Sequence, residues 1–135
     1  MKEEMHSALV TLSFSGNFDP ILMAAEIGLP PTKIRELKMY PDGPKASVSY
    51  ASKAVKGESL NIYQIVDDLL FDFHPLAQSI SSILRSAPCD VYLSVVLEIS
   101  TKLDGSTPAI GLSEEAVKLL ALLGASLDVD AYLLQ

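Results

Sequence analysis

Carboxylates are the side chains of this sequence best suited to chemistry, and one group of them falls within a helical pattern. Asp67, Asp68 and Asp72 interrupt an apolar stripe that repeats at helical spacing. Residues 68 and 72 lie one turn apart on one helix face, where paired carboxylates could serve as general acid and base. The simpler interpretation is a solvated helix face, because ionised side chains seldom leave water without a partner.

A second group of acids alternates with apolar residues near the end of the chain. Asp128, Asp130 and Tyr132 share one side of a strand expected at 125–133. Tyr92 and Glu98 share the equivalent side of a strand expected at 91–99. If these strands pair, acids and tyrosines meet on an open sheet face, which is either ordinary polar cover or a surface for a basic protein. The candidate partner-binding residues are therefore Asp67, Asp68, Asp72, Glu98, Asp128, Asp130 and Tyr132.

The sequence carries no motif for a catalytic or metal site. Its two histidines, His6 and His74, lie far apart, and neither belongs to a pattern with the several ligands that zinc requires. There is no GxSxG elbow for a nucleophilic serine and no glycine-rich phosphate loop. We therefore expect no metal, no cofactor and no enzymatic activity, and we interpret His74, just before Pro75, as a partly exposed helix-end residue.

Cys89 is the only cysteine, so an intramolecular disulfide is impossible, which agrees with a reducing compartment. The neighbouring Asp90 should raise the pKa of the thiol and so oppose reactivity. We expect Cys89 to behave as a small, buried apolar side chain.

The net charge of −7 is unevenly distributed along the chain. Residues 1–60 hold seven acids and seven bases, whereas residues 61–135 hold ten acids and three bases. Phosphate binding needs a positive surface, so nucleic acid is a poor partner for the second part. A basic protein would be attracted to it instead.

Length and composition predict one globular domain that spans residues 1–135. About half of the residues are apolar, and no apolar run approaches the roughly 18 residues that cross a bilayer, so we expect no membrane association. Glu3 and Glu4 stand where a signal peptide needs a basic region. We therefore expect a cytoplasmic protein.

Periodicity and turn residues divide the chain into strands and helices. Asp19 and Gly28 should cap a helix at 20–27, and Ser113 and Gly124 should cap one at 114–123. A longer helical stretch at 60–86 should break near Pro75. The expected strands lie at 8–15, 34–40, 46–51, 91–99 and 125–133, with a short strand at 109–112, a polar loop at 53–58 and a turn at 104–105.

The strands alternate apolar and polar residues, which predicts a sheet with one buried and one wetter face. We therefore expect an α+β fold: a two-layer sandwich in which helices cover one face of a mostly antiparallel sheet of about five to six strands.

Two stretches of the sequence resemble the bacterial domain-of-unknown-function family 4279. The first is residues 12–20 (LSFSGNFDP) followed by 27–32 (IGLPPT), and the second is 111–113 (GLS) leading to 123–132 (LGASLDVDAY). The resemblance covers nearly the whole chain and is strongest at the two ends. The middle departs from it, since family members often carry a tryptophan in the second strand region, where this chain has Ser49 and Tyr50.

The family name assigns no function, but some similar proteins are encoded beside secreted toxins. The resemblance thus implies an immunity protein, similar to those of contact-dependent growth inhibition, that binds and blocks a cognate, basic, nuclease-type toxin domain. Opposed charges would speed the association. The alternative is a small-ligand-binding or regulatory domain with a pocket between sheet and helices. A hydrolase that uses the helical carboxylates or His74 is a third possibility, and a homodimer through an exposed strand edge is compatible with all three.

Overall fold

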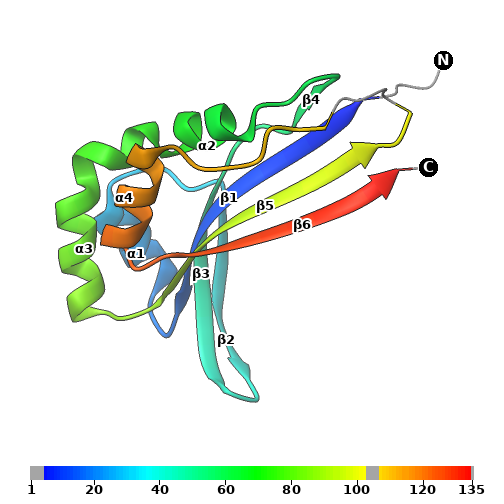
Figure 1. Ribbon diagram of the computed structural model, residues 1–135. Coiled ribbons are helices and arrows are strands. Elements are labelled where there is room, and N and C mark those ends of the chain that lie inside the picture. Colours follow the sequence, from blue (N-terminus) through cyan, green and yellow to red (C-terminus); the bar gives the residue numbers. More distant parts are fainter. Residues whose placement is uncertain (1–4, 103–106, 135) are drawn as a thin grey trace.

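A six-stranded sheet forms one layer of the protein, and helices pack against one of its two faces (Figure 1). The computed structural model describes residues 5–102 and 107–134. The strands are β1 (His6–Gly16), β2 (Lys33–Tyr40), β3 (Gly43–Ala51), β4 (Val55–Gly57), β5 (Asp90–Ser100) and β6 (Ser126–Leu134). The helices are α1 (Pro20–Ile27), α2 (Ile62–Leu70), the 3-10 helix η1 (Phe71–Leu76), α3 (Ala77–Ser86) and α4 (Glu114–Leu122).

The strand order across the sheet is β2-β3-β1-β5-β6, and β4 pairs with β1 beside this path. All of these pairs are antiparallel except β5 with β6, which run parallel. A parallel pair needs a crossover connection, and α4 lies in the segment that provides it. The expected two-layer α+β fold with a mostly antiparallel sheet is therefore confirmed.

Alternation along β1 decides which side of the sheet is buried. Val10, Leu12 and Phe14 are fully buried against the helices, whereas Leu9 and Thr11 point to the other face. The paired residues of β3 and β5 repeat this pattern, so Val48 and Leu93 join the same core. β1, β3 and β5 thus send every second side chain into one apolar cluster.

The predicted helix ends are confirmed. Asp19 caps α1, its Oδ1 accepting hydrogen bonds from the amides of Ile21 at 3.0 Å and Leu22 at 3.4 Å. Gly28 ends this helix with φ of 88°, a conformation that glycine adopts without strain. Pro75 lies inside η1, which separates α2 from α3 as the predicted break requires.

Two expectations for short segments were wrong. The predicted loop at 53–58 contains β4, which pairs with residues 6–8 of β1, whereas β3 pairs with residues 11–16. A three-residue strand is too short to be recognised from alternating apolar and polar residues. β4 forms because β3 leaves the backbone groups of residues 6–8 of β1 without a strand partner on that side. The predicted strand at 109–112 forms a single bridge between Ala109 and Asn61. The predicted turn at 104–105 lies outside the described residues.

None of the helices in the described parts of the chain is both long and apolar enough to cross a membrane.

Tyr50 lies at the centre of an aromatic group in the core. Its ring meets Phe14 and Phe73 edge-on, with centroids 6.2 Å and 5.0 Å away. Its hydroxyl donates a hydrogen bond of 3.0 Å to the carbonyl oxygen of Leu29, and burial raises the pKa of Tyr50 to about 12. The side chain therefore joins the sheet to the segment that follows α1.

Replacing Tyr50 by phenylalanine should lower the free energy of unfolding by about 1 kcal/mol, because the ring contacts survive and only the hydrogen bond to Leu29 is lost. Urea denaturation followed by circular dichroism measures this. The exposed Tyr132→Phe serves as control and should shift the midpoint little. Equal stability of Tyr50→Phe and the parent protein would contradict the role of the hydroxyl.

Candidate functional site

The face of the sheet opposite the helices, here called the open face, presents the second side of every strand. Neighbouring side chains on it follow from the register of the pairs. It carries Ser7, Leu9, Thr11, Ser13 and Ser15 from β1, Tyr92, Ser94, Val96 and Glu98 from β5, and Asp128, Asp130 and Tyr132 from β6.

The acids and tyrosine predicted from the end of the chain do meet on this face. Glu98 pairs with Tyr132, while Asp128 pairs with Ser94 and Asp130 with Val96. All four predicted residues are exposed, and Glu98 accepts a hydrogen bond of 2.8 Å from the Ser7 hydroxyl. We call Glu98, Asp128, Asp130 and Tyr132 the acidic strip. Because the three acids of this strip share one edge of one face, a partner that docks there meets all of their negative charges.

The opposite edge of the open face is basic, a feature that the sequence reasoning missed. Lys33 and Arg35 of β2 pair with Ser49 and Ser47 of β3, and Lys45 is on the same side of β3. Lys33, Arg35 and Lys45 form the basic strip. Lys45 also binds Asp42 at 2.6 Å in the β2–β3 turn. The sequence does contain a signal for this strip: Lys33 and Arg35 flank the apolar Ile34, so on a strand the two basic side chains share one side.

Between the two strips the open face is hollowed and lined with hydroxyl groups. The hollow has a volume of about 590 Å³. Its hydroxyl residues are Thr11, Ser13, Ser15, Thr32, Ser47, Ser49 and Ser94, with Tyr40 and Tyr92. Ser13 and Ser49 lie 3.0 Å apart between their Oγ atoms at its floor, and Ser13 is buried. Hydroxyls both donate and accept, so this floor can bind polar groups of either kind.

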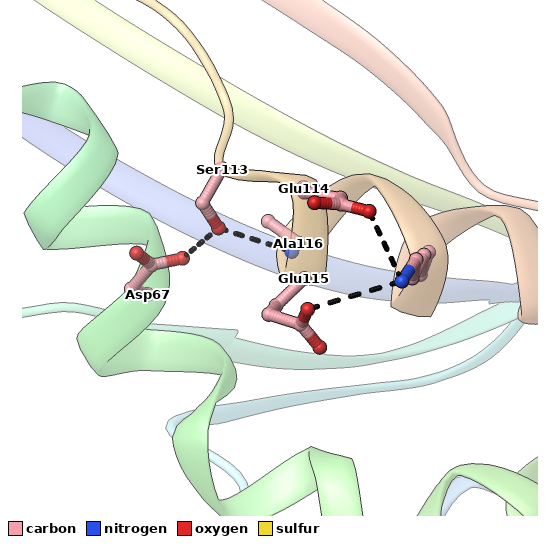
Figure 2. A network of polar contacts seen from close by, with 6 residues as sticks. Asp67, Ser113, Glu114, Glu115 and Ala116 are labelled. Carbon is pink, nitrogen blue, oxygen red and sulfur yellow. Dashed lines mark hydrogen bonds and ion pairs between the residues drawn. The ribbon is translucent and has the colours of Figure 1, made fainter.

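The helical carboxylates lie in the helix layer, away from the open face. Asp67 on α2 accepts a hydrogen bond of 2.6 Å from the Ser113 hydroxyl, which in turn accepts one of 3.1 Å from the amide of Ala116 (Figure 2). Asp67 therefore connects α2 to the start of α4. Asp68 accepts a hydrogen bond of 2.8 Å from the Gln64 amide group.

Asp68 and Asp72 line a second hollow of about 410 Å³ beside β3 and β4, which also contains Ser52 and Lys53. This hollow lies at the margin between the sheet and α2. However, the two groups of candidate acids do not form one site, because the sheet lies between them.

The histidines show no arrangement for metal binding. His6 is buried, and its Nδ1 accepts a hydrogen bond of 3.0 Å from the amide of Ser100, whereas His74 is exposed in η1. Within residues 5–102 and 107–134, no group of three or more His, Cys, Asp or Glu side chains could hold a metal ion.

Cys89 is half-buried just before β5. Burial, with a smaller effect of Asp90, raises the pKa of its thiol to about 11. The backbone of Gly16 approaches closely, since a Cβ atom added there would lie 2.8 Å from that of Cys89. The contact explains glycine at the end of β1 and agrees with a packing role for Cys89.

Comparison with known protein families identifies the family to which the chain belongs. The family described as Domain of unknown function (DUF4279) matches residues 3–134, and the chain is a member of it. Neither the curated proteins nor the solved structures contain a significant match.

Replacing Ser113 by alanine should lower the free energy of unfolding by about 2 kcal/mol, because the N-cap of α4 and the bond to Asp67 are lost together. Denaturant unfolding measures the change. The exposed Ser82→Ala on α3 is the control, with an expected change below about 0.5 kcal/mol. Equal effects of the two substitutions would show that Asp67 does not join the helices.

Alkylation of Cys89 by iodoacetamide at pH 8 should be at least about a hundredfold slower in the folded protein than in urea. Only the thiolate reacts, and raising the pKa from 9.0 to about 11 leaves far less of it at this pH. The rate should rise as the pH approaches 11. Fast alkylation of the folded protein at pH 8 would instead indicate a reactive thiol.

Proposed function

We propose that the chain is a cytoplasmic immunity protein that binds and blocks a cognate, basic, nuclease-type toxin domain. The observation that carries this proposal is the acidic strip, which concentrates exposed acids on one edge of the open face. The chain acts by binding alone, without catalysis, metal or cofactor.

The geometry of the acidic strip supports an electrostatic role. Asp128 and Asp130 are two residues apart on one strand, which separates them by about 7 Å. Screening at physiological salt limits exposed charges to a reach of about 8 Å, so these two carboxylates attract the same cation. A basic toxin domain would be steered to this edge and would associate faster than a neutral protein.

The basic strip adds a requirement on the partner. A toxin domain that covers the whole open face must place its own positive charge near β6 and negative or neutral groups near β2. A uniformly basic surface would be repelled by Lys33 and Arg35. This opposition of charge would favour the cognate toxin over other basic proteins.

A small-ligand-binding function is the second candidate, and the hydroxyl-lined hollow favours it. Lys33 and Arg35 border a floor of serines, which suits an anionic, hydrogen-bonding molecule. Raised thermal stability with such a metabolite, abolished by Arg35→Ala and accompanied by failure to bind the toxin, would favour this candidate.

Replacing Asp128 and Asp130 together by asparagine should slow association with the toxin domain encoded beside this chain by about tenfold at low salt. The effect should fade as salt is raised. Surface plasmon resonance over a range of ionic strength measures both. The matched control replaces Asp68 and Asp72 by asparagine. It changes the total charge of the protein by the same amount, but in the helix layer, and should leave the association rate nearly unchanged.

Rescue of cells that express the toxin provides the second readout. Absence of a complex together with absence of rescue would contradict the immunity function. If the substitutions of Asp68 and Asp72 slow association and those of Asp128 and Asp130 do not, the docking surface lies in the helix layer instead.

A further inference from the structure

The two edge strands of the sheet differ in how they are protected from pairing with another chain. β2 carries four charged residues in eight, and its register with β3 shifts between Arg35 and Lys38. Charged side chains and irregular pairing are the usual devices that keep an edge from adding a strand. The outer edge of β2 is therefore blocked.

β6 lacks the irregular pairing and the basic residues of β2, and its two charged side chains, Asp128 and Asp130, both lie on the open face. It runs for nine residues without lysine, arginine, proline or glycine, and it pairs with β5 without a register shift from Ser126 to Leu134. Among the described residues no strand lies on its outer side. Its outer backbone N–H and C=O groups thus form a regular edge to which a further strand can be added.

The apolar side of β6 is left uncovered by the helices. Leu127, Val129 and Leu133 are 49%, 41% and 65% exposed, although their neighbours Leu93 and Val95 on β5 are buried. The helices gather over one end of the sheet, and β6 runs away from them (Figure 1). An added strand with apolar residues at matching positions would shield these side chains from water.

The other side of β6 indicates the chemistry of the added strand. A second copy would pair antiparallel across a two-fold axis, and registers centred at residue 128, 129 or 130 place two carboxylates directly opposite one another. Such like-charge pairs oppose self-association. A strand with lysine or arginine opposite Asp128 and Asp130 converts the same positions into attractive pairs.

We propose that the free edge of β6 is a strand-addition site that receives an extended segment of the basic partner. Alternate residues of this segment are apolar and lie beside Leu127, Val129 and Leu133. The residues between them are cationic and lie beside Asp128 and Asp130. Main-chain hydrogen bonds supply affinity and the alternating side chains supply specificity. This proposal rests on the proposed function in its choice of a basic protein partner.

The direct test uses a synthetic nine-residue peptide of alternating valine and lysine, titrated into the isotopically labelled full chain and followed by NMR. The expected result is a change in the amide signals of residues 126–134. Two control peptides should bind about tenfold more weakly: one has alternate amides N-methylated, which removes strand pairing, and one has glutamate in place of lysine.

A substitution on each edge provides a matched pair of proteins. Val129→Lys gives β6 the protection that β2 already has and should weaken peptide binding about tenfold. Met39→Lys on β2, where the side chain is 78% exposed, should leave binding unchanged. If Val129→Lys proves unfolded by circular dichroism, the more exposed Leu133→Lys replaces it.

Three results would overturn strand addition at β6: signal changes centred on β2 or the helices, equal binding by the N-methylated peptide, or a dimer by sedimentation that Val129→Lys dissolves. The test is separable from the immunity function. If the toxin binds but Val129→Lys does not affect it, strand addition to the toxin is refuted and the immunity function stands. If the peptide adds to β6 but no toxin binds, the site stands and the immunity function falls.

Discussion

Burial of only one face of the sheet is the constraint on which the rest of this structure depends. The central strands β1, β3 and β5 send alternate side chains into the helix layer, and their remaining side chains lie on the open face. On the central strands this remainder is mainly serine and threonine; on the outer strands it is basic at β2 and acidic at β6. The open face thus carries opposite charges at opposite edges, with a hydroxyl-lined hollow between them.

Most of the fold could be predicted from the sequence because its signals are local. Alternation in β1 and β5, the caps at Asp19 and Gly28, and Pro75 each act within a few residues. β4 could not be found in this way. It depends on a stretch of β1 that β3 leaves unpaired, which is a property of the assembled sheet.

The candidate site was predictable only in part. Asp128, Asp130 and Tyr132 had to share a face once 125–133 formed a strand, and pairing with β5 brought Glu98 to them. Asp67 was predicted to bind a partner in the same way, as an acid that interrupts an apolar pattern. In the structure it accepts a hydrogen bond from Ser113, forty-six residues away in sequence, which no local pattern could indicate. Exposure of the apolar side of β6 was equally hidden, because alternation indicates which residues share a side but not how far the helices extend over it.

Hydrogen exchange of the chain alone and in complex with the toxin domain proposed as its partner tests most directly whether that partner docks on the open face and its β6 edge. The outer amides of β6 have no strand partner among the described residues, so docking there should slow their exchange. The expected result is new protection in residues 126–134, with α1 and α3 unchanged. Protection confined to α2 and η1 around Asp68 and Asp72, with β6 still exchanging freely, would contradict this account.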